Sequence, residues 1–445
     1  MKKLMNSTLT DFKINQFLPL IPNGNWLIFQ LSPFWVRGKK AEKSQKNLIC
    51  QSRMKQFIVI TALLISSKTF GQDSLITYMA KKNLTTFTKE GNSFSGEGWN
   101  KIIGQALAND FVLVGEDHFT NEIPYFFSAL TSQIKFDNFF CEIDPYLANI
   151  LQNNIINYSV PEIDKYKAEY GNAFSFFSIS PEFDLLKKLV NSKTNIYGLD
   201  QIFLVSDRVI CNDLQQKTKN SKAKNIYTSI SDSSKIYLEA FTKDHNKPLF
   251  YMFTDNFQKQ LNELSMLDLS KEEKEIIEAM KLSAKIYKEQ NHHLRIQLMK
   301  NQLMKVNPKW SGEKNLFKFG AIHLAKGESL LKIYDIGNLV NNIADSKFKS
   351  TLNILIIEKS GTLGAPFGLP EQHVDENSNS LKQLKPIFKA VSGDQWHCFD
   401  LIPLREALEN DKIIVKDKML SRIIKGYDLL VIIPTVTAAK YIGIK

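Results

Sequence analysis

Short runs of apolar residues recur along this chain, and they constrain its fold more than any other feature of the sequence. The runs are continuous and do not alternate with polar residues, which is the pattern of strands covered on both faces. The sequence therefore predicts an α/β fold with a central, largely parallel sheet flanked by helices. The runs occupy residues 111–114, 139–143, 195–199, 316–319, 352–357 and 429–433.

The segments between these runs show the spacing of amphipathic helices. We expect one helix to begin at Asn121, which would cap it, and another to begin at Ser180. A long helix is predicted over residues 270–305, opened by a capping box in which Ser270 is followed three places on by Glu273.

No clear strand signal lies between about residues 205 and 308. We read this region as a helical insertion between two strands of the sheet. A chain of 445 residues has room for a large core. We therefore expect residues 72–445 to form a single α/β domain that carries this insertion.

The N-terminal part of the chain has a different character. Residues 54–71 have a basic start, a short apolar run and a polar end, which is typical of a secretory signal peptide. The preceding residues 1–53 resemble no leader, and Met54 is a candidate for the true start. We expect an exported protein, periplasmic or secreted, without a stable membrane span once the signal is cleaved.

The net charge of +11 raises the question of nucleic-acid binding. Residues 1–72 carry 11 of the Lys and Arg side chains but only two acids, Asp11 and Glu42, so the rest of the chain is nearly neutral. A phosphate-binding surface needs basic residues clustered on a folded face. We therefore expect a small-molecule or peptide substrate as the partner, and no nucleic acid.

Ionisable residues follow the ends of four predicted strands. Glu116 and His118 end the first run, Glu142 ends the second, Asp200 follows "NIYGLD", and His323 ends "LFKFGAIH". Each residue alone is equally typical of a helix cap or a structural ion pair. In a parallel sheet, however, the carboxyl ends of the strands lie along one edge, where ligands bind. The sequence therefore predicts that these side chains share one cleft.

The order of the motifs resembles that of the erythromycin-esterase-like and Tiki/ChaN-like superfamily. The pieces are GExH at residues 115–118 and GAxH at 320–323, with "FFCEI", "YGLD" and "RIQLMKN" between them. The resemblance implies an α/β fold in which the glutamate and histidine of the first motif face the second histidine. The first motif is one residue shorter than is usual in the esterase branch. It is closer to the Tiki/ChaN branches, where metal-dependent peptidases and haem-binding lipoproteins occur.

These residues suit the hydrolysis of an ester or amide. A histidine can take a proton from water near neutral pH, and we expect His118 to do so, with Glu116 or Glu142 orienting it or the water. His323 is a candidate donor to an oxyanion or a leaving group, and Arg295 a source of fixed positive charge. Asp200 completes the predicted site.

Two alternatives use the same cleft. A divalent metal held by His118, His323 and Glu116, with Glu142 as a further ligand, would activate water directly. A protein that binds haem or iron without turnover would need the same side chains. A scaffold that keeps its acids only as strand-end caps is a third reading. The neighbouring pair His292 and His293 is expected at a solvated or partly packed surface, because adjacent helix residues point in different directions and both cannot share one face.

Overall fold

The structure, a computed structural model, describes residues 71–91, 93–248 and 250–442. The predicted leader (1–53) and residues 54–70 of the predicted signal peptide lie outside the described residues. Gly71, the last residue of that prediction, begins a helical segment over 71–82. Within the described part of the chain, no helix has both the length and the apolar character needed to cross a membrane.

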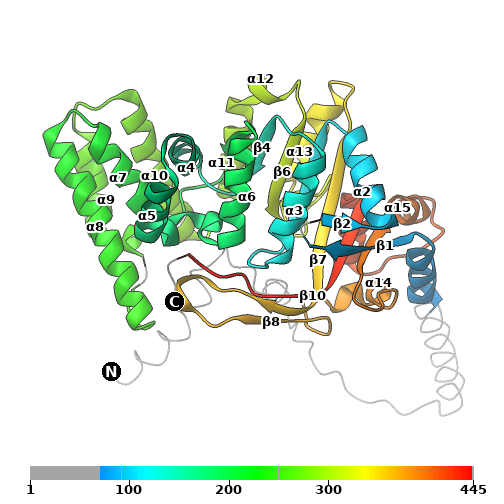
Figure 1. The fold of residues 1–445 in the computed structure, drawn as a ribbon. Helices are drawn as coiled ribbons and strands as arrows, with labels where there is room; N and C mark the ends of the chain where they lie inside the picture. The colour runs from blue at the N-terminus through cyan, green and yellow to red at the C-terminus, as the bar shows by residue number, and fades with distance from the viewer. Residues whose placement is uncertain (1–70, 92, 249, 443–445) are drawn as a thin grey trace, which may run out of the picture.

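The described residues form one mixed sheet of ten strands (Figure 1). The strands are β1 (Leu84–Glu90), β2 (Ser93–Ser95), β3 (Phe111–Glu116), β4 (Asn138–Cys141), β5 (Asn195–Gly198), β6 (Asn315–Gly320), β7 (Thr351–Leu363), β8 (Gln372–Asp375), β9 (Trp396–Asp400) and β10 (Leu429–Val436). Their order is β2-β1-β9-β10-β7-β3-β6-β4-β5, with β8 paired to β7.

The sheet is parallel from β10 to β5 and antiparallel elsewhere. The largely parallel α/β fold predicted from the apolar runs is thereby confirmed, and every predicted run lies on a parallel strand. The missed strands β1, β2, β8 and β9 all pair antiparallel. Three of them, β1, β2 and β8, are partly exposed, so they lack the continuous apolar run of a doubly covered strand.

Helices cover both faces of the sheet. Successive side chains of β3 point to alternate faces, and both sets are buried. Val112 and Val114 pack into one hydrophobic cluster, and Phe111 and Leu113 pack into the other. The first face carries α2 (Glu97–Ala108), α3 (Glu122–Gln133), α4 (Pro145–Asn157) and α6 (Ser180–Asn191). The second face carries α11 (His292–Lys305), α12 (Asn307–Trp310), α13 (Ile336–Asp345), α14 (Lys385–Phe388), α15 (Ile402–Glu409) and α16 (Lys418–Gly426).

Between β5 and β6 the described chain contains helices but no strand. Figure 1 shows these helices gathered beyond the β5 edge of the sheet, beside α4 and α5 (Val160–Tyr170). The helices are α7 (Asp207–Lys217), α8 (Ser221–Lys243), α9 (Asp255–Ser265) and α10 (Lys271–Glu289), followed by α11.

The single long helix predicted over residues 270–305 is wrong. The capping box of Ser270 and Glu273 does open α10, but the chain leaves the helix at Gln290, whose φ is 50°. Asn291 then starts α11 by accepting a hydrogen bond from the backbone of Leu294. A left-handed residue interrupts the helical hydrogen bonds, so the two segments take separate directions.

Two predicted caps also differ from the structure. Asn121 precedes α3, but its side chain makes no capping bond and donates instead to Thr437 and to the carbonyl of Ala438. Ser180 is the first residue of α6 and not its cap, which is Ile179. The Asn121 side chain is satisfied by hydrogen bonds to the distant C-terminal segment, so it is not available to cap α3.

Candidate active site

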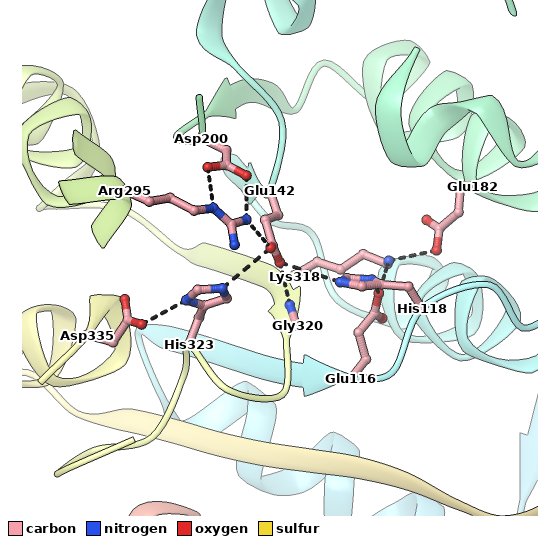
Figure 2. Close-up of polar contacts among 10 residues, drawn as sticks. All are labelled: Glu116, His118, Glu142, Glu182, Asp200, Arg295, Lys318, Gly320, His323 and Asp335. Atoms are coloured by element: carbon pink, nitrogen blue, oxygen red, sulfur yellow. Dashed lines mark hydrogen bonds and ion pairs between the residues drawn. The ribbon is translucent and has the colours of Figure 1, made fainter. Parts of the chain in front are cut away.

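Four neighbouring parallel strands bring the predicted residues to one edge of the sheet. Glu116 is the last residue of β3, and Glu142 follows β4 directly. Asp200 and His323 lie two and three residues beyond the ends of β5 and β6. Because β3, β6, β4 and β5 are adjacent and parallel, all four ends face the same side. Figure 2 shows these side chains, with His118, pointing toward one another.

Glu142 lies at the centre of the cluster. Its carboxylate accepts hydrogen bonds from Arg295 and from the backbone of Gly320, each at 2.6 Å. Nε2 of His118 is 3.5 Å from one of its oxygens, and Nε2 of His323 is 3.4 Å from the other. Burial opposes ionisation, but the charges of His323 and Arg295 outweigh it and hold the pKa of Glu142 well below its usual value. Glu142 is therefore a fixed anion between two imidazoles.

His118 is held on both sides of its ring. Nδ1 donates to Oε1 of Glu116 at 3.0 Å, and Phe176, in a 3₁₀ turn (Ser175–Ser178), stacks on the imidazole with 4.0 Å between ring centroids. Burial alone would lower the pKa of His118, but hydrogen bonds to Glu116 and Glu142 outweigh it and raise the pKa to about 9. The residue is buried, with 6% of its surface exposed.

His323 is held in the same way by a different partner. Its Nδ1 donates to Oδ2 of Asp335 at 2.8 Å. The other oxygen of Asp335 caps α13 by accepting from the backbone of Ile336 at 2.7 Å. Burial opposes the charge of His323, yet the charges of Asp335 and Glu142 raise its pKa to about 10. Both imidazoles thus have a carboxylate on Nδ1 and face Glu142 through Nε2.

Arg295 connects the ends of β4 and β5. It donates through Nε and Nη2 to the two oxygens of Asp200, at 2.9 and 2.6 Å, and through Nη2 to Glu142. Burial disfavours the cation, but the charges of Asp200 and Glu142 keep its pKa above the usual value. Its place depends on the break at Gln290, because α11 starts anew there and carries Arg295 in its first turn.

Lys318 and Glu182 belong to the cluster, although the motifs did not indicate them. Nζ of Lys318 donates to Glu182 at 2.7 Å and also to Glu116. Lys318 lies in the middle of β6, where every residue is buried. A lysine inside an apolar strand run needs buried acids as partners, so "LFKFG" was a usable signal for this group.

The predicted metal ligands do not converge on one point. Glu116 lies on the Nδ1 side of His118 and is engaged by Lys318, whereas His323 lies on the Nε2 side, beyond Glu142. Among the described residues, no group of three or more His, Cys, Asp or Glu side chains is placed to hold a metal ion.

His292 and His293 lie at the start of α11 and have different surroundings. His293 is exposed. His292 is partly buried, and its ring lies 5.8 Å from that of His323. Burial, followed by the charges of Arg295 and His323, lowers the pKa of His292 to about 2. His292 is therefore a neutral neighbour of the cluster. The sequence did not indicate this position beside His323.

Neither a known protein family nor a curated protein matches this sequence. Solved structures do match. A succinoglycan biosynthesis protein has a TM-score of 0.51 at 14% identity, over 82% of this chain and 98% of its own. This chain shares that fold.

Two other matching structures belong to the groups that the motifs resembled. Erythromycin esterase EreC, in its open conformation, has a TM-score of 0.49 at 13% identity, over 78% of this chain and 95% of its own. ChaN of Campylobacter jejuni, a haem-binding protein, has a TM-score of 0.26 at 14% identity, over 58% and 86%. Both groups that the motifs resemble are thus represented among the matching structures. At such identities the likeness concerns the fold alone.

Proposed function

We propose that this protein hydrolyses an ester or amide bond of a small molecule or peptide with water activated by His118. The observation that carries the proposal is the meeting of two imidazoles at one carboxylate, with Nε2 of His118 and of His323 at 3.5 and 3.4 Å from Glu142. Hydrolysis needs a base for water and a donor for the oxyanion or leaving group. Two adjacent imidazoles can divide these roles.

His118 is oriented for the base. Its Nδ1–H donates to Glu116, so loss of the other proton leaves the lone pair on Nε2, which faces the cluster. Lys318, which also donates to Glu182, donates to the same oxygen of Glu116 and holds it in place. Because the pKa of His118 is about 9, the basic form becomes more abundant as the pH rises through that value.

His323 suits the role of donor. Asp335 accepts from Nδ1, so a protonated His323 directs its second N–H from Nε2 towards Glu142 and the same space. Arg295, held by Asp200, adds fixed positive charge next to this group. In this scheme Glu142 aligns both rings and takes no proton itself, because its pKa is held low.

Capture of haem or iron is the alternative, and the geometry favours it less. Among the described residues, no three His, Cys, Asp or Glu side chains are grouped so that they could hold a metal ion. The acid on the far side of His118, Glu116, is engaged by Lys318. We therefore derive no step through a metal or haem.

The test is hydrolysis of a panel of nitrophenyl esters and anilides by the purified protein. We expect His118→Ala to reduce kcat/KM by about 10²–10⁴-fold, the usual contribution of a general base. His323→Ala should also lower it strongly. His293→Ala, an exposed histidine on the same helix as Arg295, is the matched control and should keep full activity.

Two results would reject the assignment. One is undiminished hydrolysis in both His118→Ala and His323→Ala, with circular dichroism showing that the variants are folded. The other is a tight, stoichiometric haem spectrum on addition of haemin, lost in the same two variants, together with no hydrolysis by the native chain. That second result would establish the binding alternative.

A further inference from the structure

Two carboxyl groups at the edge of the cluster lack the counter-ion that its other buried acids have. Among the described residues, neither Asp117 nor Glu358 forms an ion pair with a lysine, arginine or histidine. The paired acids are Glu116 and Glu182 with Lys318, Glu142 and Asp200 with Arg295, and Asp335 with His323. Asp117 and Glu358 are therefore two neighbouring acids without a cation of the chain beside them.

The register of the sheet brings these two residues together. β3 and β7 are parallel neighbours, with Gly115 opposite Leu355, so Asp117 lies level with residues 357–358. The carboxyl groups are near enough for each charge to act on the other. The next residue, Lys359, points to the opposite face of β7 and pairs with Glu376.

Glu358 is the inner of the two groups. It has 1% of its surface exposed, and among the described residues its oxygens have no hydrogen-bond partner apart from the carboxyl group of Asp117. Asp117 is partly exposed and lies directly before His118 in the chain. The pair thus runs from a partly exposed residue beside the imidazole to a buried carboxyl behind it.

A buried carboxylate without a partner is costly, and two side by side are costlier still. Burial is the main cause that raises the pKa of both groups. The charge of Asp117 raises the pKa of Glu358 further, whereas the interaction with Glu358 and the charge of His118 act against the rise in the pKa of Asp117. A positively charged ligand would remove this cost by supplying donors and charge together. Every other buried acid in the cluster already has such a partner within the chain.

We propose that Asp117 and Glu358 form a subsite for an ammonium group of the substrate, next to the imidazole of His118. This assignment rests on the proposed hydrolytic function and narrows its substrate to cationic esters or amides. An ammonium group has three N–H donors and needs only acceptors. A divalent ion needs about six or more oxygen ligands. The described residues offer no third His, Cys, Asp or Glu ligand beside the pair.

The first experiment measures binding and needs no turnover. Thermal shift and calorimetry are run with n-butylammonium chloride, neutral butan-1-ol and magnesium chloride on the full chain. We expect butylammonium to stabilise the native chain and the control Glu122→Gln, a nearby acid that is bonded to Thr437. It should have no effect on Asp117→Asn or Glu358→Gln, and butan-1-ol none on any of them.

The Glu358→Gln variant should fold, because it removes a buried charge that has no partner. If Glu358→Gln does not fold, Asp117→Asn, at a partly exposed position, provides an independent measurement of butylammonium binding. Three outcomes overturn the proposal: stabilisation by magnesium in place of butylammonium, equal stabilisation of all variants, or no stabilisation of the native chain. The last would mean that the two carboxyls share a proton.

The second experiment measures selectivity in hydrolysis. It compares a nitrophenyl ester ending in a primary ammonium group with its isostere, in which a methyl group replaces the ammonium. We expect kcat/KM to favour the cation by about tenfold, the scale of one charge-assisted contact. Asp117→Asn and Glu358→Gln should lose the preference while still cleaving the neutral ester.

The two experiments separate failure of the subsite from failure of the function. Hydrolysis of both esters at equal rates would overturn the subsite and leave the proposed function standing. Butylammonium binding that depends on Asp117 and Glu358, without hydrolysis of any ester, would support the subsite as a cation site and reject the hydrolytic function.

Discussion

Each imidazole of the site lies between two carboxylates, and this placement decides its charge. His118 has Glu116 on Nδ1 and Glu142 before Nε2, while His323 has Asp335 and the same Glu142. A neighbouring negative charge stabilises the imidazolium form, so both pKa values rise although burial acts against them. At neutral pH the two rings are positively charged, and His118 becomes a base only in alkaline solution.

A prediction at this scale concerns the pH dependence of hydrolysis. For the native chain, kcat/KM should increase with pH and level off above about 9, following deprotonation of His118. Glu116→Gln removes one of the two anions that raise this pKa, so the midpoint should move down by about 1–3 pH units. The pH profiles of the two proteins on one neutral ester are the measurement.

Rate loss at the plateau would accompany this shift, because Glu116 also fixes the tautomer of His118. Glu122→Gln is the control, since it removes a carboxylate from the first turn of α3 without touching the imidazole. An unchanged midpoint in Glu116→Gln would show that another group controls the profile.

At the scale of elements, the site depends on how strands and helices begin and end. Gly320 ends β6 and donates its N–H to Glu142, which anchors the central carboxylate to the sheet. Asp335 caps α13 with one oxygen and holds His323 with the other. The restart of α11 after Gln290 directs Arg295 inward. Each polar side chain is positioned by an element that it also helps to terminate or connect.

A prediction at this scale is that Gly320→Ala lowers activity more than stability. A Cβ atom at Gly320 would lie 3.2 Å from Nε2 of His118 and 3.3 Å from an oxygen of Glu142, closer than most such contacts. The ring must shift by a few tenths of an ångström, which breaks the alignment of the base. We expect kcat/KM to fall by about 10²-fold, since misplacement of up to an ångström can cost that much.

The matched control is Gly104→Ala, where a Cβ would meet no atom within 4 Å. Gly104 lies inside α2, so alanine should raise the free energy of unfolding by about 0.5–1 kcal/mol and leave hydrolysis unchanged. If Gly320→Ala kept full activity, close packing at the end of β6 would have no part in aligning His118.

At the scale of the whole molecule, the buried cluster connects stability to pH. In the unfolded chain both histidines return to a pKa near 6.5, whereas in the folded chain the values are about 9 and 10. Folding therefore favours the protonated rings. This contribution to stability is complete below about pH 6.5 and is lost as the pH rises through the two folded values.

We therefore predict that the free energy of unfolding decreases between about pH 7 and 10. The loss should be on the order of 3 kcal/mol for each histidine. Relaxation of the site around the neutral imidazoles reduces this loss. Chemical denaturation across this range is the measurement. The double variant His118→Gln with His323→Gln should show a flatter dependence, and an equal slope in both proteins would contradict the assigned cause.

Much of the architecture could be predicted from local patterns. Doubly covered strands need continuous apolar runs, so every parallel strand was recognised, whereas the partly exposed β1 and β8 carry no such run. The break between α10 and α11 at Gln290 was not predicted, because the apolar spacing continues across it. A single left-handed residue leaves no mark on that periodicity.

The predicted polar residues share one edge of the sheet because parallel strands end there. This grouping could be predicted once the strands were recognised as parallel. Their partners could not be foreseen in this way. Lys318 contacts Glu116 across 202 residues of chain and Glu182 across 136, and Asp335 contacts His323 across 12. No local spacing encodes such pairs.

The sequence by itself determined the parallel strands, their shared direction and the residues at their ends, because burial on two faces and the position of polar residues are recorded locally. Only the tertiary structure decided which charge meets which. Counter-ions reach the cluster from helices and strands distant in the chain, and they set the protonation of His118 and His323. The same packing left Asp117 and Glu358 together without a cation, because charge balance depends on three-dimensional proximity.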